Sequence, residues 1–83
     1  CGGWPMNLFA VTEVLNEEGV SHRSISPTAL RLDWLIDGAS RPVIVFDLKV
    51  NRITPMSDHK YMPKQDKDRL RAIVRRCKIK NVH

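Results

Sequence analysis

Residues 31–50 read RLDWLIDGASRPVIVFDLKV, and this stretch decides the expected fold. Two apolar runs, 28–36 and 42–50, flank a short polar segment that begins at Asp37-Gly38. Runs of this length separated by an Asp-Gly pair are typical of two strands joined by a tight turn. The stretch therefore predicts a β-hairpin.

Two acids stand inside these predicted strands, where acids are uncommon and costly to bury. Asp33 lies in the first strand and Asp47 in the second. Because side chains alternate between the faces of a strand, Lys49 shares a face with Asp47. A loop over residues 38–42 sets the two acids directly across from each other, and a loop two residues shorter makes them diagonal neighbours. Like charges this close destabilise a sheet, so the pattern predicts a site for a hard divalent cation, magnesium or manganese.

Apolar residues at helical spacing predict a helix on each side of the hairpin. The first spans Trp4 to Glu18, and the second begins at Pro63. The expected buried stripe of the second helix consists of Leu70, Ile73, Val74 and Cys77. Residues 20–27 and 51–62 are polar and rich in turn residues, which predicts loops, and residues 78–82 fit a short closing strand. The predicted fold class is therefore α/β, a small mixed or antiparallel sheet flanked by the two helices, with the element order helix, strand, strand, helix, strand.

Size and charge limit what the chain can be. Its 83 residues suffice for one small domain, and 14 lysines and arginines against 9 acids give a formal net charge of +5. This balance favours an anionic partner, nucleic acid before a membrane surface. No apolar run approaches the roughly 18 residues of a spanning helix. Because the chain starts at Cys1 without an initiator methionine, we expect it to be a fragment of a longer protein.

The second predicted helix carries basic residues at three- and four-residue spacing, which places them on one face. These are Lys64, Lys67, Arg71, Arg75 and Lys78. Such a stripe is expected to follow the phosphate backbone of nucleic acid without reading its sequence. The competing interpretation is a solubilising face, diluted by Asp66 and Asp68. His59, in the predicted loop after Lys49, could reach a phosphate as well; the competing interpretation is a histidine that is only solvated.

The acids and the lysine carry a resemblance to a known family. Asp33, followed across a hairpin by Asp47-Leu48-Lys49, resembles the motif of the PD-(D/E)xK nuclease superfamily, also called restriction-endonuclease-like. The core of that superfamily has the element order predicted above. The resemblance covers residues 4–82 but rests on few fixed positions, and Leu32 stands where the family name has proline.

The resemblance implies roles for these residues. Asp33 and Asp47 would bind the metal, the backbone carbonyl of Leu48 would be a further ligand, and Lys49 would position or activate the attacking water. The implied reaction is metal-dependent hydrolysis of phosphodiester bonds in DNA or RNA, with Mg or Mn as the cofactor.

The resemblance implies roles for residues on the two predicted helices as well. Glu13 or Glu17 on the first helix would match an acid that some members place there. Gln65 resembles a glutamine found in some branches and joins the basic stripe as a nucleic-acid contact. Those branches have a tyrosine four residues later, where this chain has Arg69.

Some small nucleases of this superfamily are C-terminal toxin domains of large bacterial proteins. A chain of this kind would have an acidic immunity protein as its partner. It would be secreted as part of its parent and would act in the cytoplasm of a target cell.

The same residues fit a simpler arrangement. Asp33 pairs with Arg31 or Arg41 on a solvent-facing sheet surface, and Asp47 and Lys49 form an exposed polar pair there. The chain is then a non-catalytic nucleic-acid-binding module, or a protein-interaction domain whose partner covers the hairpin.

Overall fold

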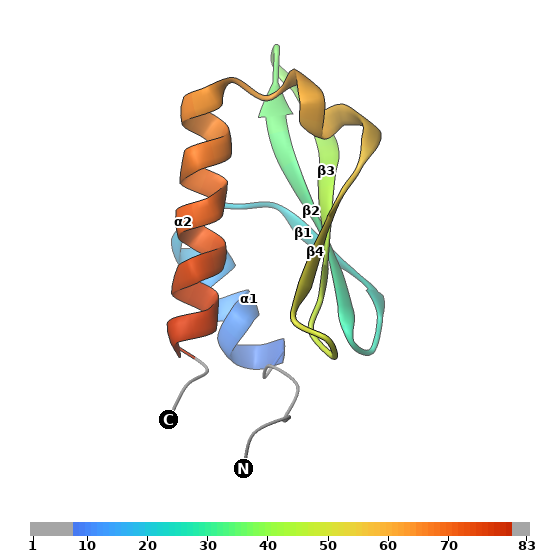
Figure 1. Ribbon diagram of the computed structural model, residues 1–83, viewed down its shortest axis with the longest axis vertical. Coiled ribbons are helices and arrows are strands. Elements are labelled where there is room, and N and C mark those ends of the chain that lie inside the picture. The colour runs from blue at the N-terminus through green and yellow to red at the C-terminus, as the bar shows by residue number, and fades with distance from the viewer. Residues whose placement is uncertain (1–7, 81–83) are drawn as a thin grey trace.

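The computed structural model describes residues 8–80, and their side chains as far as residue 78, as a four-stranded antiparallel sheet with two helices (Figure 1). The elements, in chain order, are α1 (Leu8–Glu17), β1 (His22–Ser26), β2 (Ala29–Ile36), β3 (Ala39–Asp47), β4 (Arg52–Pro55), the 3-10 helix η1 (Ser57–Tyr61) and α2 (Lys64–Lys80). The strands lie in the sheet in the order in which they follow one another along the chain.

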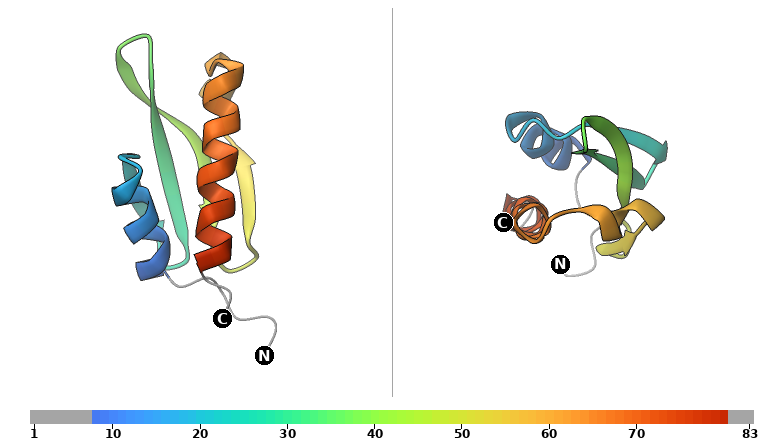
Figure 2. Two further views of the ribbon diagram at one scale, coloured as in Figure 1. Left: turned by 90° about the vertical axis from the view of Figure 1, so that its left-hand side faces the viewer. Right: turned by 90° about the horizontal axis from the view of Figure 1, so that it is seen from above.

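Both helices lie on one face of this sheet, side by side (Figure 2). Strand β4 lies on the far side of α2 from α1. The opposite face, called the outer face below, has no helix over it within the described residues. No helix in residues 8–80 is long and apolar enough to cross a membrane.

The α/β class predicted from the sequence is confirmed, but the predicted element order is wrong. Residues 20–27 contain β1, and residues 51–62 contain β4 and η1, where loops were predicted. Residues 78–80 continue α2 instead of starting a closing strand. The predicted start of the first helix, residues 4–7, and the end of the closing strand, residues 81 and 82, lie outside the described residues.

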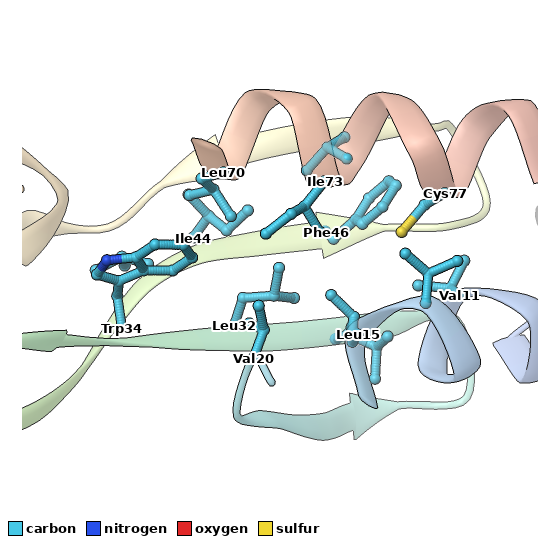
Figure 3. Close-up of a cluster of buried hydrophobic side chains, with 14 of the residues drawn as sticks. Val11, Leu15, Val20, Leu32, Trp34, Ile44, Phe46, Leu70, Ile73 and Cys77 are labelled. Atoms are coloured by element: carbon cyan, nitrogen blue, oxygen red, sulfur yellow. The ribbon is translucent and has the colours of Figure 1, made fainter. Parts of the chain in front are cut away.

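The core fills the space between the helices and the sheet (Figure 3). Alternate residues of β2 point into it, so that Leu30, Leu32, Trp34 and Ile36 are buried while their neighbours face outward. The buried stripe predicted for the second helix is confirmed: it consists of Leu70, Ile73, Val74 and Cys77. Burial raises the pKa of the Cys77 thiol to about 11, so this cysteine stays a neutral apolar group.

Helix α1 ends in a glycine cap, which turns the chain toward β1. Gly19 has a φ of 72°, a conformation that side-chain-bearing residues rarely adopt. The amide of Val20 donates to the carbonyl of Leu15 (2.9 Å), and the amide of Gly19 donates to that of Asn16 (3.2 Å). This pair of bonds satisfies the last carbonyls of the helix and places the buried Val20 against the core.

The β2–β3 hairpin is longer and tighter than predicted. Asp37 and Gly38 form a two-residue turn, with φ values of 50° and 80°, so Ile36 pairs with Ala39. Between the pairs Asp33–Pro42 and Leu32–Ile44, strand β3 contains one extra residue, Val43. This bulge lets Val43 and Ile44, adjacent in sequence, both be fully buried.

Candidate nucleic-acid interface

Asp33 lies on the outer face of β2, in an ion pair with its neighbour Arg31. The arginine donates two hydrogen bonds to the carboxylate, from Nε to Oδ1 (3.0 Å) and from Nη2 to Oδ2 (3.2 Å). Both side chains are half-buried, at 27% and 16% exposure. Such a two-point contact occupies both carboxylate oxygens, as the simpler sequence interpretation expected.

Asp47 is the last residue of β3 and holds the turn that follows. Its Oδ1 accepts hydrogen bonds from the backbone amides of Lys49 (2.9 Å) and Val50 (3.4 Å). Side-chain oxygens of aspartate commonly fold back on the amides two and three residues ahead in this way. Lys49 is exposed and lies in this turn, since the strand predicted to reach Val50 ends at Asp47.

The two acids share the outer face but do not meet. Asp33 pairs with Pro42, whereas Asp47 pairs with Ala29, which precedes Asp33 by four positions in β2. At about 3.3 Å per residue this places the two backbones roughly 13 Å apart along the strand. The predicted juxtaposition of Asp33 and Asp47 is therefore wrong, because the two-residue turn and the bulge at Val43 set a different register.

The other residues expected to hold a metal do not form a site with Asp33 or Asp47. Glu13 and Glu17 are on α1, which packs on the helix face of the sheet, away from Asp33 and Asp47. Leu48 is buried, and its amide donates to the carbonyl of Thr28 (2.7 Å). In the part of the chain that the structure describes, no three histidine, cysteine or acidic side chains gather closely enough to hold a metal ion.

Positive charge, in contrast, is concentrated on one element. Helix α2 carries eight lysines and arginines against two aspartates, so the rest of the chain has six basic and seven acidic residues. The net charge of +5 is therefore a property of this helix. Its basic residues as far as residue 78 divide between two edges, one facing α1 and the other facing β4.

The edge of α2 that faces α1 is neutralised. Arg76 contacts the carboxylates of both Glu17 and Glu18, the latter at 2.8 Å, and these contacts raise the pKa of its guanidinium. Arg69 donates to the backbone carbonyl of Glu18 (2.9 Å), and its guanidinium carbon lies 5.4 Å from the centre of the Trp34 ring. Trp34 is thus a packing residue, and this edge holds the two helices together.

The edge of α2 that faces β4 carries the predicted basic stripe. At 3.6 residues per turn its five members fall within an arc of about 80° and extend along about 21 Å of helix. They are Lys64, Lys67, Arg71, Arg75 and Lys78, called the α2 stripe below. Gln65 is exposed in the first turn of the same helix but points away from this arc.

One acid partly compensates the α2 stripe. Asp68 contacts Lys64 (3.0 Å) and Arg71 (3.7 Å), and its hydrogen bond with Lys64 lowers the pKa of its carboxyl. Lys67, Arg75 and Lys78 form no ion pair within residues 8–78. Most of the α2 stripe is therefore available to an external anion.

A groove of about 190 Å³ runs between this edge of α2 and the β4 side of the sheet. It is lined by Ile44, Ile53, His59, Lys67, Leu70, Arg71 and Val74. Burial, together with the charges of Lys67 and Arg71, lowers the pKa of His59. The sequence patterns point to His59 and the basic residues but not to Ile53, because the polar composition of residues 51–62 predicts a loop. The alternation Arg52-Ile53-Thr54 is the signal that indicates a strand there.

Comparisons with known proteins add no relative. No protein-family model matches this chain, and neither a curated protein nor a solved structure matches it.

Proposed function

We propose that this chain is a nucleic-acid-binding module that contacts the phosphate backbone through the α2 stripe. The observation that supports the proposal best is the unequal pairing on α2, where three of five stripe residues, Lys67, Arg75 and Lys78, have no acidic partner within the described residues. Lysine and arginine side chains in such a row bind phosphates and release condensed counterions, which gives affinity without base recognition.

The spacing of the α2 stripe suits an extended polyanion. Its members are spread over about 21 Å of one helix, so a single small anion cannot engage all of them. A nucleic-acid strand presents phosphates at regular intervals over that length. The exposed position of the stripe leaves room for a bulky ligand, because Lys64, Arg71 and Arg75 are all exposed.

The test is the salt dependence of binding, measured by fluorescence anisotropy with a labelled oligonucleotide. We expect the logarithm of the binding constant to fall linearly with the logarithm of salt concentration. Replacing two phosphate contacts, Lys67→Gln with Arg75→Gln, should reduce that slope by about 2. The matched control, Arg23→Gln with Arg52→Gln, removes the same charge from β1 and β4 and should leave the slope nearly unchanged.

Two outcomes would overturn the proposal. In one, both double variants weaken binding equally, so that net charge alone accounts for the affinity. In the other, polyglutamate of matched charge displaces the oligonucleotide at the same charge concentration. An acidic protein, such as the immunity partner expected for a toxin, would then be the better candidate ligand for the α2 stripe.

The metal-dependent nuclease with a restriction-endonuclease-like core stays a separate proposal. For Asp33 and Asp47 to hold one ion, the first would have to leave Arg31 and the second would have to leave the turn after β3. The same oligonucleotide, incubated with magnesium or manganese and run on a denaturing gel, tests this. Cleavage that is lost in both Asp47→Asn and Lys49→Ala would support the nuclease, and an intact substrate would count against it.

A further inference from the structure

The groove between α2 and β4 combines two surfaces of different chemistry. Its floor is aliphatic, formed by side chains of Ile44 and Ile53 from the sheet and of Leu70 and Val74 from α2. Its rim is cationic, formed by Lys67 and Arg71 of α2 together with His59 of η1. Among the described residues, no acidic side chain lines it. Its ligand should therefore present an apolar surface next to a negative charge.

The rim carries more positive charge than its surroundings compensate. His59 is disfavoured as a cation by burial and by two neighbouring positive charges, those of Lys67 and Arg71. Asp68 reaches Arg71 only at 3.7 Å, from outside the groove, and shares its charge with Lys64. An anionic group at the rim would offset this repulsion, which makes the rim a suitable position for a phosphate.

The aliphatic floor of the groove suits a single strand better than a duplex. In a duplex the flat faces of the bases are stacked inside the helix and cannot reach a side-chain surface. In a single strand a base can leave the stack and lie against protein, while its phosphate remains on a cationic groove. Ile53, which is only partly buried, offers such a base an aliphatic surface next to the rim, whereas Ile44 is fully buried beneath it.

We propose that this groove binds one unpaired nucleotide of single-stranded nucleic acid, with the base against Ile53 and the phosphate at His59, Lys67 and Arg71. The inference rests on the proposed function, since the α2 stripe that binds the flanking phosphates forms one side of the groove. It adds a preference that the stripe alone cannot supply: single-stranded ligands bind more tightly than duplexes.

The first experiment needs no variant. Binding of the full chain is compared for a single-stranded oligonucleotide, its duplex, and the same strand with all bases removed over its central part. Removing roughly 40 Å² of apolar surface from water corresponds to about a fivefold change in affinity, so we expect the abasic strand, which lacks the contact with Ile53, to bind about fivefold more weakly than the intact strand. The duplex should also bind more weakly than the intact strand at equal salt.

The second experiment places one negative charge on either side of β4. Ile53 pairs with the buried Phe46 and faces the groove, whereas its neighbour Thr54 pairs with Val45 and faces outward. Ile53→Asp should abolish the preference for the intact strand, and Thr54→Asp should retain it. Since Ile53 is partly buried, Ile53→Thr is the milder variant, and circular dichroism checks that each variant is folded.

The results separate the two proposals. Equal affinity for intact and abasic strands, with the salt dependence preserved, overturns the groove and leaves the α2 stripe in place. Tighter binding of the duplex than of the single strand also overturns it. If the full chain binds none of the three ligands at low salt, the proposed function itself is wrong.

Discussion

The two edges of α2 have the same kind of side chains but different surroundings. On one edge, Arg69 and Arg76 meet Glu17 and Glu18 at the end of α1. On the other edge, the α2 stripe meets one acid of the described part of the chain, Asp68, and an aliphatic groove. The arginine content of an edge therefore does not tell whether its charge is neutralised within the fold or left exposed.

The partners decide what each edge does. Glu17 and Glu18 lie at the C-terminal end of α1, where the helix dipole disfavours negative charge, and the two arginines offset this cost. Their charge is used within the fold. Within residues 8–78 the α2 stripe faces no comparable set of acids, so most of its charge is left uncompensated by the fold. Four predictions test this contrast.

The largest expected effect is on binding. Replacing Lys67, Arg71 and Arg75 together with glutamine should weaken oligonucleotide binding on the order of 100-fold, since each lost phosphate contact removes roughly 1 kcal/mol. The melting temperature should stay nearly constant. The comparison fails if Arg69→Gln with Arg76→Gln, measured by the same anisotropy assay, loses as much affinity.

The second effect is on stability. Arg69→Ala removes the contact with the Trp34 ring and the hydrogen bond to the carbonyl of Glu18, and should lower the free energy of unfolding by about 1 kcal/mol. Urea denaturation followed by circular dichroism measures this. Arg75→Ala, from the other edge, serves as the control and should unfold at the wild-type urea concentration. Equal midpoints for the two variants would contradict a structural role for Arg69.

The third prediction is a smaller effect, a gain in the oligonucleotide affinity proposed for the α2 stripe. Asp68→Asn frees Lys64 and Arg71 from their acid and should tighten oligonucleotide binding by about threefold at low salt. The gain should disappear at high salt because screening removes it. Asp37→Asn, at the tip of the hairpin, makes the same charge change away from α2 and should give a smaller gain. Unchanged affinity in Asp68→Asn would mean that the acid does not limit the stripe.

The smallest effect is a dependence on pH. The pKa of His59 is lowered from its ordinary 6.5 in the folded protein, so the unfolded chain takes up this proton more readily. Stability from this group is therefore complete above about pH 6.5 and decreases as the pH falls below it. A bound phosphate favours the charged imidazole, so binding should instead strengthen over the same range.

The variant His59→Gln tests both predicted pH dependences, the loss of stability and the gain in binding as the pH falls. Melting temperatures and binding constants are compared between about pH 7.5 and about pH 5.5, where histidine changes its charge. The variant should show a flatter pH dependence of both quantities than the wild type. A variant that retains the full dependence of binding would exclude His59 as the titrating group.

The sequence was most informative where a local pattern alone determines the structure. Alternation predicted the strand from Thr28 to Ile36 to within one residue of β2, and helical spacing predicted the buried stripe of α2. These elements bury one continuous face, so period and burial agree. The stripe on α2 followed from the same periodicity.

Strand register and contacts between residues far apart in the chain could not be predicted from local sequence patterns. The distance between Asp33 and Asp47 depends on the turn type and on the extra residue at Val43. The sequence left the length of the loop between the two strands open, so it predicted neither. Strands β1 and β4 are short edge strands of polar composition, which resembles that of loops. The neutralised edge of α2 could not be foreseen either, because Arg76 and Glu17 are 59 residues apart in sequence and meet only after the helices pack.

The bulge at Val43 makes the direction of the β2–β3 hairpin tip sensitive to insertions and deletions in β3. A bulge increases the local twist and re-aims the part of the hairpin beyond it. The direction of the β2–β3 tip is therefore set by how many residues β3 contains, and less by which residues they are. Deleting Val43 should redirect the tip, and with it Arg41, away from Asp58 of η1, even if every remaining side chain were conserved.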